Sequence, residues 1–218
     1  MYIDISNVTQ MLGSQVFIKS LLGLHAFTGC DNVSAFAGKG KIAALKLLKQ
    51  SKLYQDLFHQ IGMQWDITDE MFSKIEEFTC KICSTALETK EVNELRYRLF
   101  CVKKAKLESQ QLPPCADCLK LHTQRANYQA AIWKRSLQGC PNVPSPTGHG
   151  WIHEDAKLVI KWMDGEPAPT AGLEFLSCSC TRSCKPSSCT CIINGLNRSA
   201  LICVDYVTVT IVQKMNLS

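Results

Sequence analysis

The sequence predicts a mainly α-helical protein: a helical bundle with a helix–turn–helix element, then a small cysteine-rich irregular segment and a C-terminal strand. Three observations support this prediction. Helix start and stop signals recur through the first hundred residues. The apolar residues between these signals are spaced to share one helical face. Residues 201–212, in contrast, combine alternation with β-branched side chains, which is the pattern of a strand.

The composition is that of a chain able to build a hydrophobic core. Of its 218 residues, 46% are hydrophobic, which argues against wholesale disorder. Lysine and arginine number 24 against 19 acids, and the net charge of +5 permits a nucleic-acid partner without the strong basicity of a dedicated binder. No apolar run reaches the length of a membrane span, and the first residues lack the features of a signal peptide. The 13 cysteines therefore favour a reducing compartment, the nucleus or the cytoplasm, over a disulfide scaffold.

Helix signals divide the first hundred residues. Asn7 with Gln10 fits a capping box, and Gly13 fits the end of that first helix. Thr68 and Thr89 fit the N-caps of two later helices. After the first helix, the expected helices cover residues 14–27, 40–50, about 53–62, 68–83 and 89–104.

Proline and glycine divide the second half. Pro113 and Pro114 open a long helix, because proline suits the first helical turn. In that helix we expect Arg125, Lys134 and Arg135 to face solvent, with the apolar side chains in the core. Residues 141–150 are expected to form a loop, 157–163 a strand and 164–172 a second break. The predicted regions are a helical one over 1–110, a helix plus Pro/Gly-rich linker over 111–165, and a cysteine-rich one over 166–218.

A carboxylate and a glycine-framed turn lie close together near the N-terminus. Residues 21–31 form an apolar helix that ends in a tight turn presenting Asp31. Seven residues later, Gly38-Lys39-Gly40 opens the next helix, whose N–H groups and positive dipole end suit phosphate. Lys39 and Lys41 add charge there. Asp31 can ligate a hard metal ion, but one carboxylate cannot build a two-metal site.

This segment resembles the DNA-backbone-gripping element of flap endonucleases and their PIN-like relatives. The matching features are Leu21-Leu22, Gly29-Cys30-Asp31, Gly38-Lys39-Gly40 and the helix from Ala44 to Leu48, with extensions over 5–13 and through Gln60. The resemblance implies that Asp31 is a magnesium ligand. It also implies that Gly38, Lys39 and Gly40 grip the phosphate backbone without reading sequence, and Lys41 and Lys46 are candidates to assist them.

Most acids that such a nuclease needs are missing here. In that family they lie upstream in a Rossmann-like sheet, whereas Asp4 is the one acid upstream of Asp31 in this chain. We therefore expect a binding remnant with an orphaned ligand at Asp31 and a missing N-terminal nuclease half. The alternative is an ordinary helix–turn–helix core with solvated lysines. His25 is expected to be a partly buried histidine with no catalytic role.

Five cysteines gather within fourteen residues: Cys178, Cys180, Cys184, Cys189 and Cys191. Turn-forming residues separate them, and this spacing suits zinc thiolate ligation. The segment resembles the tesmin-type CXC module, a zinc-cluster domain that contacts DNA. Only Cys203 follows, so the resemblance implies half a module that can hold one zinc ion. An unstructured cysteine-rich tail is the alternative.

Two Cys-x-x-Cys pairs precede that cluster. Cys115, Cys118 and His122 are candidates for a second metal site, because Cys118 and His122 share a helical face. Cys80 and Cys83 also share a face, although such a pair is more often a packing feature. Neither pair follows a strand, so neither has the usual context of a redox motif.

Nearly the whole chain resembles transposon-associated proteins of animal genomes that join a flap-endonuclease-like core to a CXC segment. The matching blocks are 125–133, 149–151 and 162–165, ahead of the cysteines. Three functions follow as hypotheses: a nucleic-acid-binding fragment with DNA favoured, a magnesium-dependent endonuclease completed by absent acids, and a zinc-stabilised protein-interaction module. The first is preferred, so catalysis by this chain as it stands is not expected.

Overall fold

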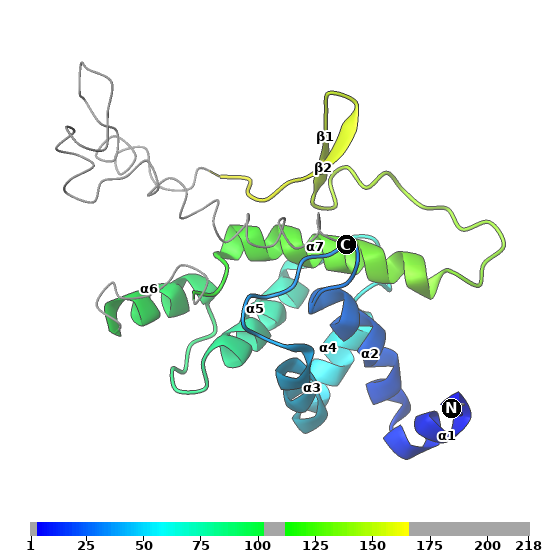
Figure 1. Cartoon of the computed structure of the whole chain (residues 1–218), viewed down its shortest axis with the longest axis horizontal. Helices are drawn as coiled ribbons and strands as arrows, with labels where there is room; N and C mark the ends of the chain where they lie inside the picture. The colour runs from blue at the N-terminus through cyan, green and yellow to red at the C-terminus, as the bar shows by residue number, and fades with distance from the viewer. Residues whose placement is uncertain (1–3, 103–111, 166–218) are drawn as a thin grey trace, which may run out of the picture. The chain divides into compact units, whose positions relative to one another are not determined.

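The computed structural model describes residues 4–102 and 112–165 (Figure 1). Within them lie α1 (Ile5–Leu12), α2 (Gln15–Phe27), α3 (Lys41–Gln50), α4 (Lys52–Gln60), α5 (Asp69–Cys83), α6 (Val92–Val102), α7 (Ala116–Lys134), β1 (Trp151–Glu154) and β2 (Lys157–Ile160). The prediction of a mainly α-helical chain is confirmed. The chain divides between Trp162 and Met163 into two units, and all these elements belong to the first. The predicted strand over 201–212 lies outside the described residues.

Local signals place several helix ends correctly. The Ser14 hydroxyl accepts a hydrogen bond from the Phe17 N–H at the start of α2, and the Thr68 hydroxyl accepts one from Met71 at the start of α5. Gly13 ends α1 with a φ of 76°. These ends were predictable because each depends on the type of residue at the helix end: a hydroxyl that accepts a hydrogen bond at Ser14 and Thr68, and the freedom of glycine to adopt a positive φ at Gly13.

Three predicted helix starts were wrong. Asp4, not Asn7, caps α1, since its carboxylate accepts hydrogen bonds from the N–H groups of Ser6 and Asn7 at 2.9 and 3.2 Å. The α6 helix begins at Val92, because the Thr89 hydroxyl instead donates to the Glu94 carboxylate. At α7 the N-cap is Cys115, so the two prolines lie ahead of the first turn.

The core lies between α2, α4, α5 and α7. A mid-helix glycine, Gly23, lets α2 approach α4 closely, since a Cβ there would lie 2.3 Å from the Phe58 carbonyl oxygen. Phe27, Phe58 and Phe78 meet in this space, with ring centroids 4.6 to 6.2 Å apart. The α7 helix packs against α2 and α5 (Figure 1). Residues 116–134, which were predicted to form a core helix ahead of the Pro/Gly-rich linker, therefore share the core of the first hundred residues.

A two-stranded antiparallel hairpin follows the 141–150 loop. Trp151 pairs with Ile160 and Glu154 with Lys157. The predicted strand over 157–163 is confirmed over 157–160, whereas β1 was not predicted. Its turn uses Asp155 and Ala156 with φ values of 46° and 62°. Glycine or asparagine usually supplies such angles, so the sequence here lacks the ordinary hairpin signal.

The prediction that Arg125 faces solvent was wrong. Its side chain is 1% exposed and donates hydrogen bonds to the carbonyl oxygens of Gly150 and Lys161 at 3.0 and 2.7 Å. The guanidinium also lies 5.2 Å from the centre of the Trp162 ring. Arg125 thereby ties both ends of the hairpin to α7.

Candidate nucleic-acid interface

The turn after α2 presents Asp31 to solvent. Cys30 and Val33 form a short antiparallel bridge, in which the Cys30 N–H donates to the Val33 carbonyl at 2.8 Å. Val33 is buried beneath the turn, so the two residues between them project outward. One of these, Asn32, donates from its amide to the Gln129 side-chain oxygen at 3.0 Å. The other is Asp31, which is exposed at the tip.

A buried histidine of α7 holds the base of the same turn. His122 Nε2 lies 2.8 Å from the Phe27 carbonyl oxygen, and Nδ1 lies 3.3 Å from the Ser34 hydroxyl. Burial, with a smaller effect of the Arg125 charge, lowers the pKa of His122 to about 4. The ring is therefore neutral at physiological pH. Its nitrogens connect two points of the chain on either side of Asp31.

The Gly38-Lys39-Gly40 turn leaves the start of α3 open. Gly38 has a φ of 65°, which favours glycine. Gly40, the N-cap of α3, has an ordinary φ of −75°, forms no side-chain cap, and has nothing within 4 Å of where a Cβ would stand. Serine or aspartate would cap this helix better. Neither the backbone conformation nor any neighbouring atom of the described residues requires glycine at position 40. The space beside Gly40 is therefore open to a group from outside the chain.

Two of the three predicted phosphate-binding lysines have partners within the chain. Lys39 Nζ donates to the Cys83 carbonyl, the last residue of α5, at 3.1 Å. Lys41 Nζ reaches the end of α2, where it donates to the carbonyl oxygens of His25 and Gly29. Such placement at helix C-termini is favourable for a cation. These ammonium groups are held in place beside the turn, whereas Lys46 is exposed on α3.

Two aromatic rings adjoin Lys41, the exposed His25 and the partly buried Trp133. His25 was predicted to be partly buried, but it is exposed on α2. Its ring centre lies 5.6 Å from that of Trp133 at 30°, and its Nδ1 lies 2.9 Å from Lys41 Nζ. Burial and then the Lys41 charge lower the pKa of His25, while Asp31 opposes them. Aromatic rings beside fixed positive charge are a common arrangement in proteins that bind single-stranded nucleic acid.

Charge is unevenly distributed along the helical unit. Residues 4–60, which form α1 to α4 and the intervening turns, carry six lysines and three aspartates, a net charge of +3. Residues 61–102 carry five basic and eight acidic residues, a net charge of −3. The glycine turn therefore lies in the basic part of the unit.

The described residues do not assemble the predicted metal sites. Within 4–102 and 112–165, no three His, Cys, Asp or Glu side chains gather closely enough to hold an ion. Asp31 thus has no such cluster around it. Cys115 and Cys118 are adjacent, but both nitrogens of His122 face other partners. The predicted zinc ligands Cys178, Cys180, Cys184, Cys189 and Cys191 lie outside the described residues.

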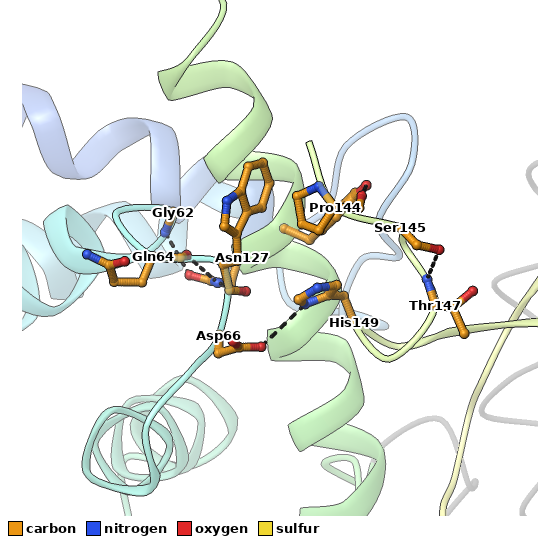
Figure 2. A network of polar contacts seen from close by, with 10 residues as sticks. Gly62, Gln64, Asp66, Asn127, Pro144, Ser145, Thr147 and His149 are labelled. Atoms are coloured by element: carbon orange, nitrogen blue, oxygen red, sulfur yellow. Dashed lines mark hydrogen bonds and ion pairs between the residues drawn. The ribbon is translucent and has the colours of Figure 1, made fainter. Parts of the chain in front are cut away.

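Sequence reasoning missed the polar side chains through which α7 holds the loops. The Asn127 amide accepts from the Gly62 N–H at 2.7 Å and donates to the Gln64 and Trp65 carbonyls at 2.9 and 2.8 Å. Figure 2 shows this amide facing the backbone, with the Asp66–His149 pair at 3.7 Å beside it. The one available signal was the density of polar residues in a helix that was expected to line the core.

Comparison of the chain with protein-family models, with curated proteins and with solved structures gives no match. Among the helices of the described ranges, none combines the length and apolarity needed to cross a membrane.

Proposed function

We propose that this chain binds nucleic acid, with DNA favoured, by holding the phosphate backbone at the start of α3 without reading base sequence. The observation that carries the proposal is the uncapped, sterically open Gly40 between two lysines with defined positions. The kinship with flap-endonuclease-like, transposon-associated proteins and a nuclear location belong to the same proposal.

Each group has a defined part in this binding. In the first turn of α3 the Ala43 N–H donates to the Gly40 carbonyl at 3.1 Å, so the N–H groups of Lys41 and Ile42 are the ones that donate to a phosphate oxygen. Lys39 and Lys41 each bring a positive charge that their carbonyl partners do not neutralise. Lys46 contacts a neighbouring phosphate from the exposed face of α3. The His25–Trp133 pair provides a stacking surface where a strand is unpaired.

A fluorescence-anisotropy titration with branched and duplex DNA tests the proposal. Affinity is expected to fall steeply with salt, with a log–log slope of about −0.9 for each phosphate contacted. Gly40→Ser places a side chain where the phosphate approaches, while providing a better helix cap. We expect it to weaken binding about ten-fold, the equivalent of one lost hydrogen bond to a charged group.

Gly139→Ser is the matched control, since a Cβ at Gly139 also meets nothing within 4 Å and the residue lies outside the interface. Equal affinity of the two serine variants would contradict the role of Gly40. Absence of salt-sensitive binding by the unchanged protein would contradict the whole proposal and favour the zinc-stabilised interaction module.

Magnesium-dependent cleavage is a second candidate, favoured by the exposure of Asp31 at the tip of its turn. It needs further carboxylates from outside the described residues. Incubation with flap DNA and magnesium tests it. Cleavage that Asp31→Ala abolishes would support it, and cleavage indifferent to that change would indicate a contaminating nuclease.

A further inference from the structure

Two Cys-x-x-Cys pairs occupy opposite ends of two helices. Cys80 and Cys83 form the last turn of α5, where the helix dipole disfavours a thiolate. Cys115 is the N-cap of α7, and Cys118 lies in its first turn. There the dipole and the free N–H groups favour a thiolate. The two pairs have the same spacing, but the helix dipole favours the thiolate form in one and disfavours it in the other.

The start of α7 positions Cys115 as an acceptor of hydrogen bonds. Its Sγ accepts from the Cys118 N–H at 3.5 Å. Asn93 of α6 accepts from the Ala116 N–H at 3.0 Å, and Arg96 of α6 donates to the Pro113 carbonyl. Two side chains of α6 therefore hold the backbone that carries the pair.

The pKa values of the four thiols follow these positions at the helix ends. The hydrogen bond from Cys118 lowers the pKa of Cys115 to about 6 despite burial, with a smaller contribution from the Arg96 charge and opposition from Asp117. The same contact raises the pKa of Cys118. In the other pair, burial raises the pKa of Cys80 to about 12 and of Cys83 to about 11.

We propose that Cys115 and Cys118 are a redox-active dithiol that undergoes exchange with low-molecular-weight disulfides, with Cys115 as the attacking sulfur. Both residues are partly accessible, in contrast to the fully buried Cys80. The nucleic-acid interface contains neither residue, so this proposal is independent of the proposed function.

The exchange proceeds in two balanced steps. The Cys115 thiolate attacks one sulfur of a disulfide RSSR, an S–S bond forms between Cys115 and RS, and RS⁻ leaves and takes up a proton. Cys118 then loses its proton and attacks the Cys115 sulfur of this mixed disulfide, releasing the second RS⁻. Overall, the dithiol is oxidised to a disulfide and RSSR is reduced to two RSH.

The full chain, incubated with oxidised glutathione, tests this directly. After acid quenching and alkylation of free thiols, trypsin releases residues 107–120, which contain Cys115 and Cys118 and no other cysteine. We expect this peptide to escape alkylation and to weigh two hydrogens less than the reduced, unalkylated peptide, as formation of one disulfide requires. With Cys118→Ser the peptide is expected to gain one glutathione at Cys115. With Cys115→Ser, modification of Cys118 is expected to be at least about ten-fold slower, because burial disfavours the Cys118 thiolate even when the Cys115 sulfur is absent.

The Cys80–Cys83 pair is the internal control and is expected to stay reduced under the same conditions. A 107–120 peptide that stays reduced while the exposed Cys101 and Cys140 are modified would overturn the proposal. So would equal reaction rates of the Cys115→Ser and Cys118→Ser proteins. Release of one zinc ion on alkylation of this pair would also overturn it and assign the two thiols to metal binding.

Discussion

Replacing Asn127 by alanine is expected to destabilise the helical unit by about 3 kcal/mol. The residue is 0% exposed, and its amide forms three hydrogen bonds to the backbone of Gly62, Gln64 and Trp65. Each such bond contributes about 0.5–1.5 kcal/mol, and the substitution leaves all three backbone partners without it. For a unit of this size, the loss corresponds to a melting temperature lower by roughly 6–12 °C.

Urea denaturation followed by circular dichroism measures this free energy of unfolding, and Gln138→Ala, an exposed site just after α7, is the control. Asn127→Asp sharpens the test. Its carboxylate keeps an acceptor for the Gly62 N–H but faces two carbonyl oxygens, so the folded state favours its protonated form. Destabilisation should therefore grow as pH rises above about 3.9, the ordinary aspartate pKa. A loss below about 0.5 kcal/mol for Asn127→Ala, or a pH-independent effect of Asn127→Asp, would refute the reasoning.

Three further outcomes are expected. Burial lowers the pKa of Lys134 to about 8, so between pH 8 and the ordinary lysine pKa the unfolded state binds one more proton than the folded state, and the free energy of unfolding rises with pH. Lys134→Met should remove this rise in urea denaturation measured at several pH values, and an unchanged pH dependence would contradict the prediction. Lys41→Met should raise the pKa of His25, because the Lys41 charge lowers it, and an NMR titration of the imidazole measures the change. A lower or unchanged pKa would argue against the contact between the two side chains. Gly40→Ser should raise the melting temperature slightly, by a few tenths of a kcal/mol in stability, since serine caps a helix better than glycine, and a lower melting temperature would show that position 40 has no room for a side chain.

Helix positions were largely predictable because they follow from interactions within a few residues. Ser14, Thr68 and Gly13 mark the ends of their helices as expected. Within α3 the spacing predicts a buried face of Ala44, Leu47 and Leu48; Ala44 and Leu48 are buried, Leu47 is partly buried, and Lys46 on the opposite face is exposed. The errors at the starts of α1, α6 and α7 are shifts of about one turn or less. They arise where neighbouring residues compete for the same capping role.

The roles of individual polar side chains were not predictable in the same way. Lys39 was predicted to contact phosphate, with a solvated lysine as the alternative, and no feature of the sequence indicated that its ammonium group donates to the Cys83 carbonyl 44 residues away. Arg125 was expected in solvent, whereas its partners Gly150 and Lys161 bury it. The hydropathy of arginine and lysine predicts exposure on average, and it contains no information about distant carbonyl groups.

Sequence alone determined that this protein is a set of helices, where most of them lie, and that a carboxylate and an open glycine turn stand on either side of one loop. These features depend on local propensity, caps and spacing. Tertiary structure decided which polar groups are buried, because Asn127 meets Gly62 across 65 residues and Asn32 meets Gln129 across 97. It also decided that one Cys-x-x-Cys pair begins a helix while the other ends one. Burial and the direction of a helix axis arise only when the chain packs, so the reactivity of a thiol or an ammonium group follows from them and not from composition.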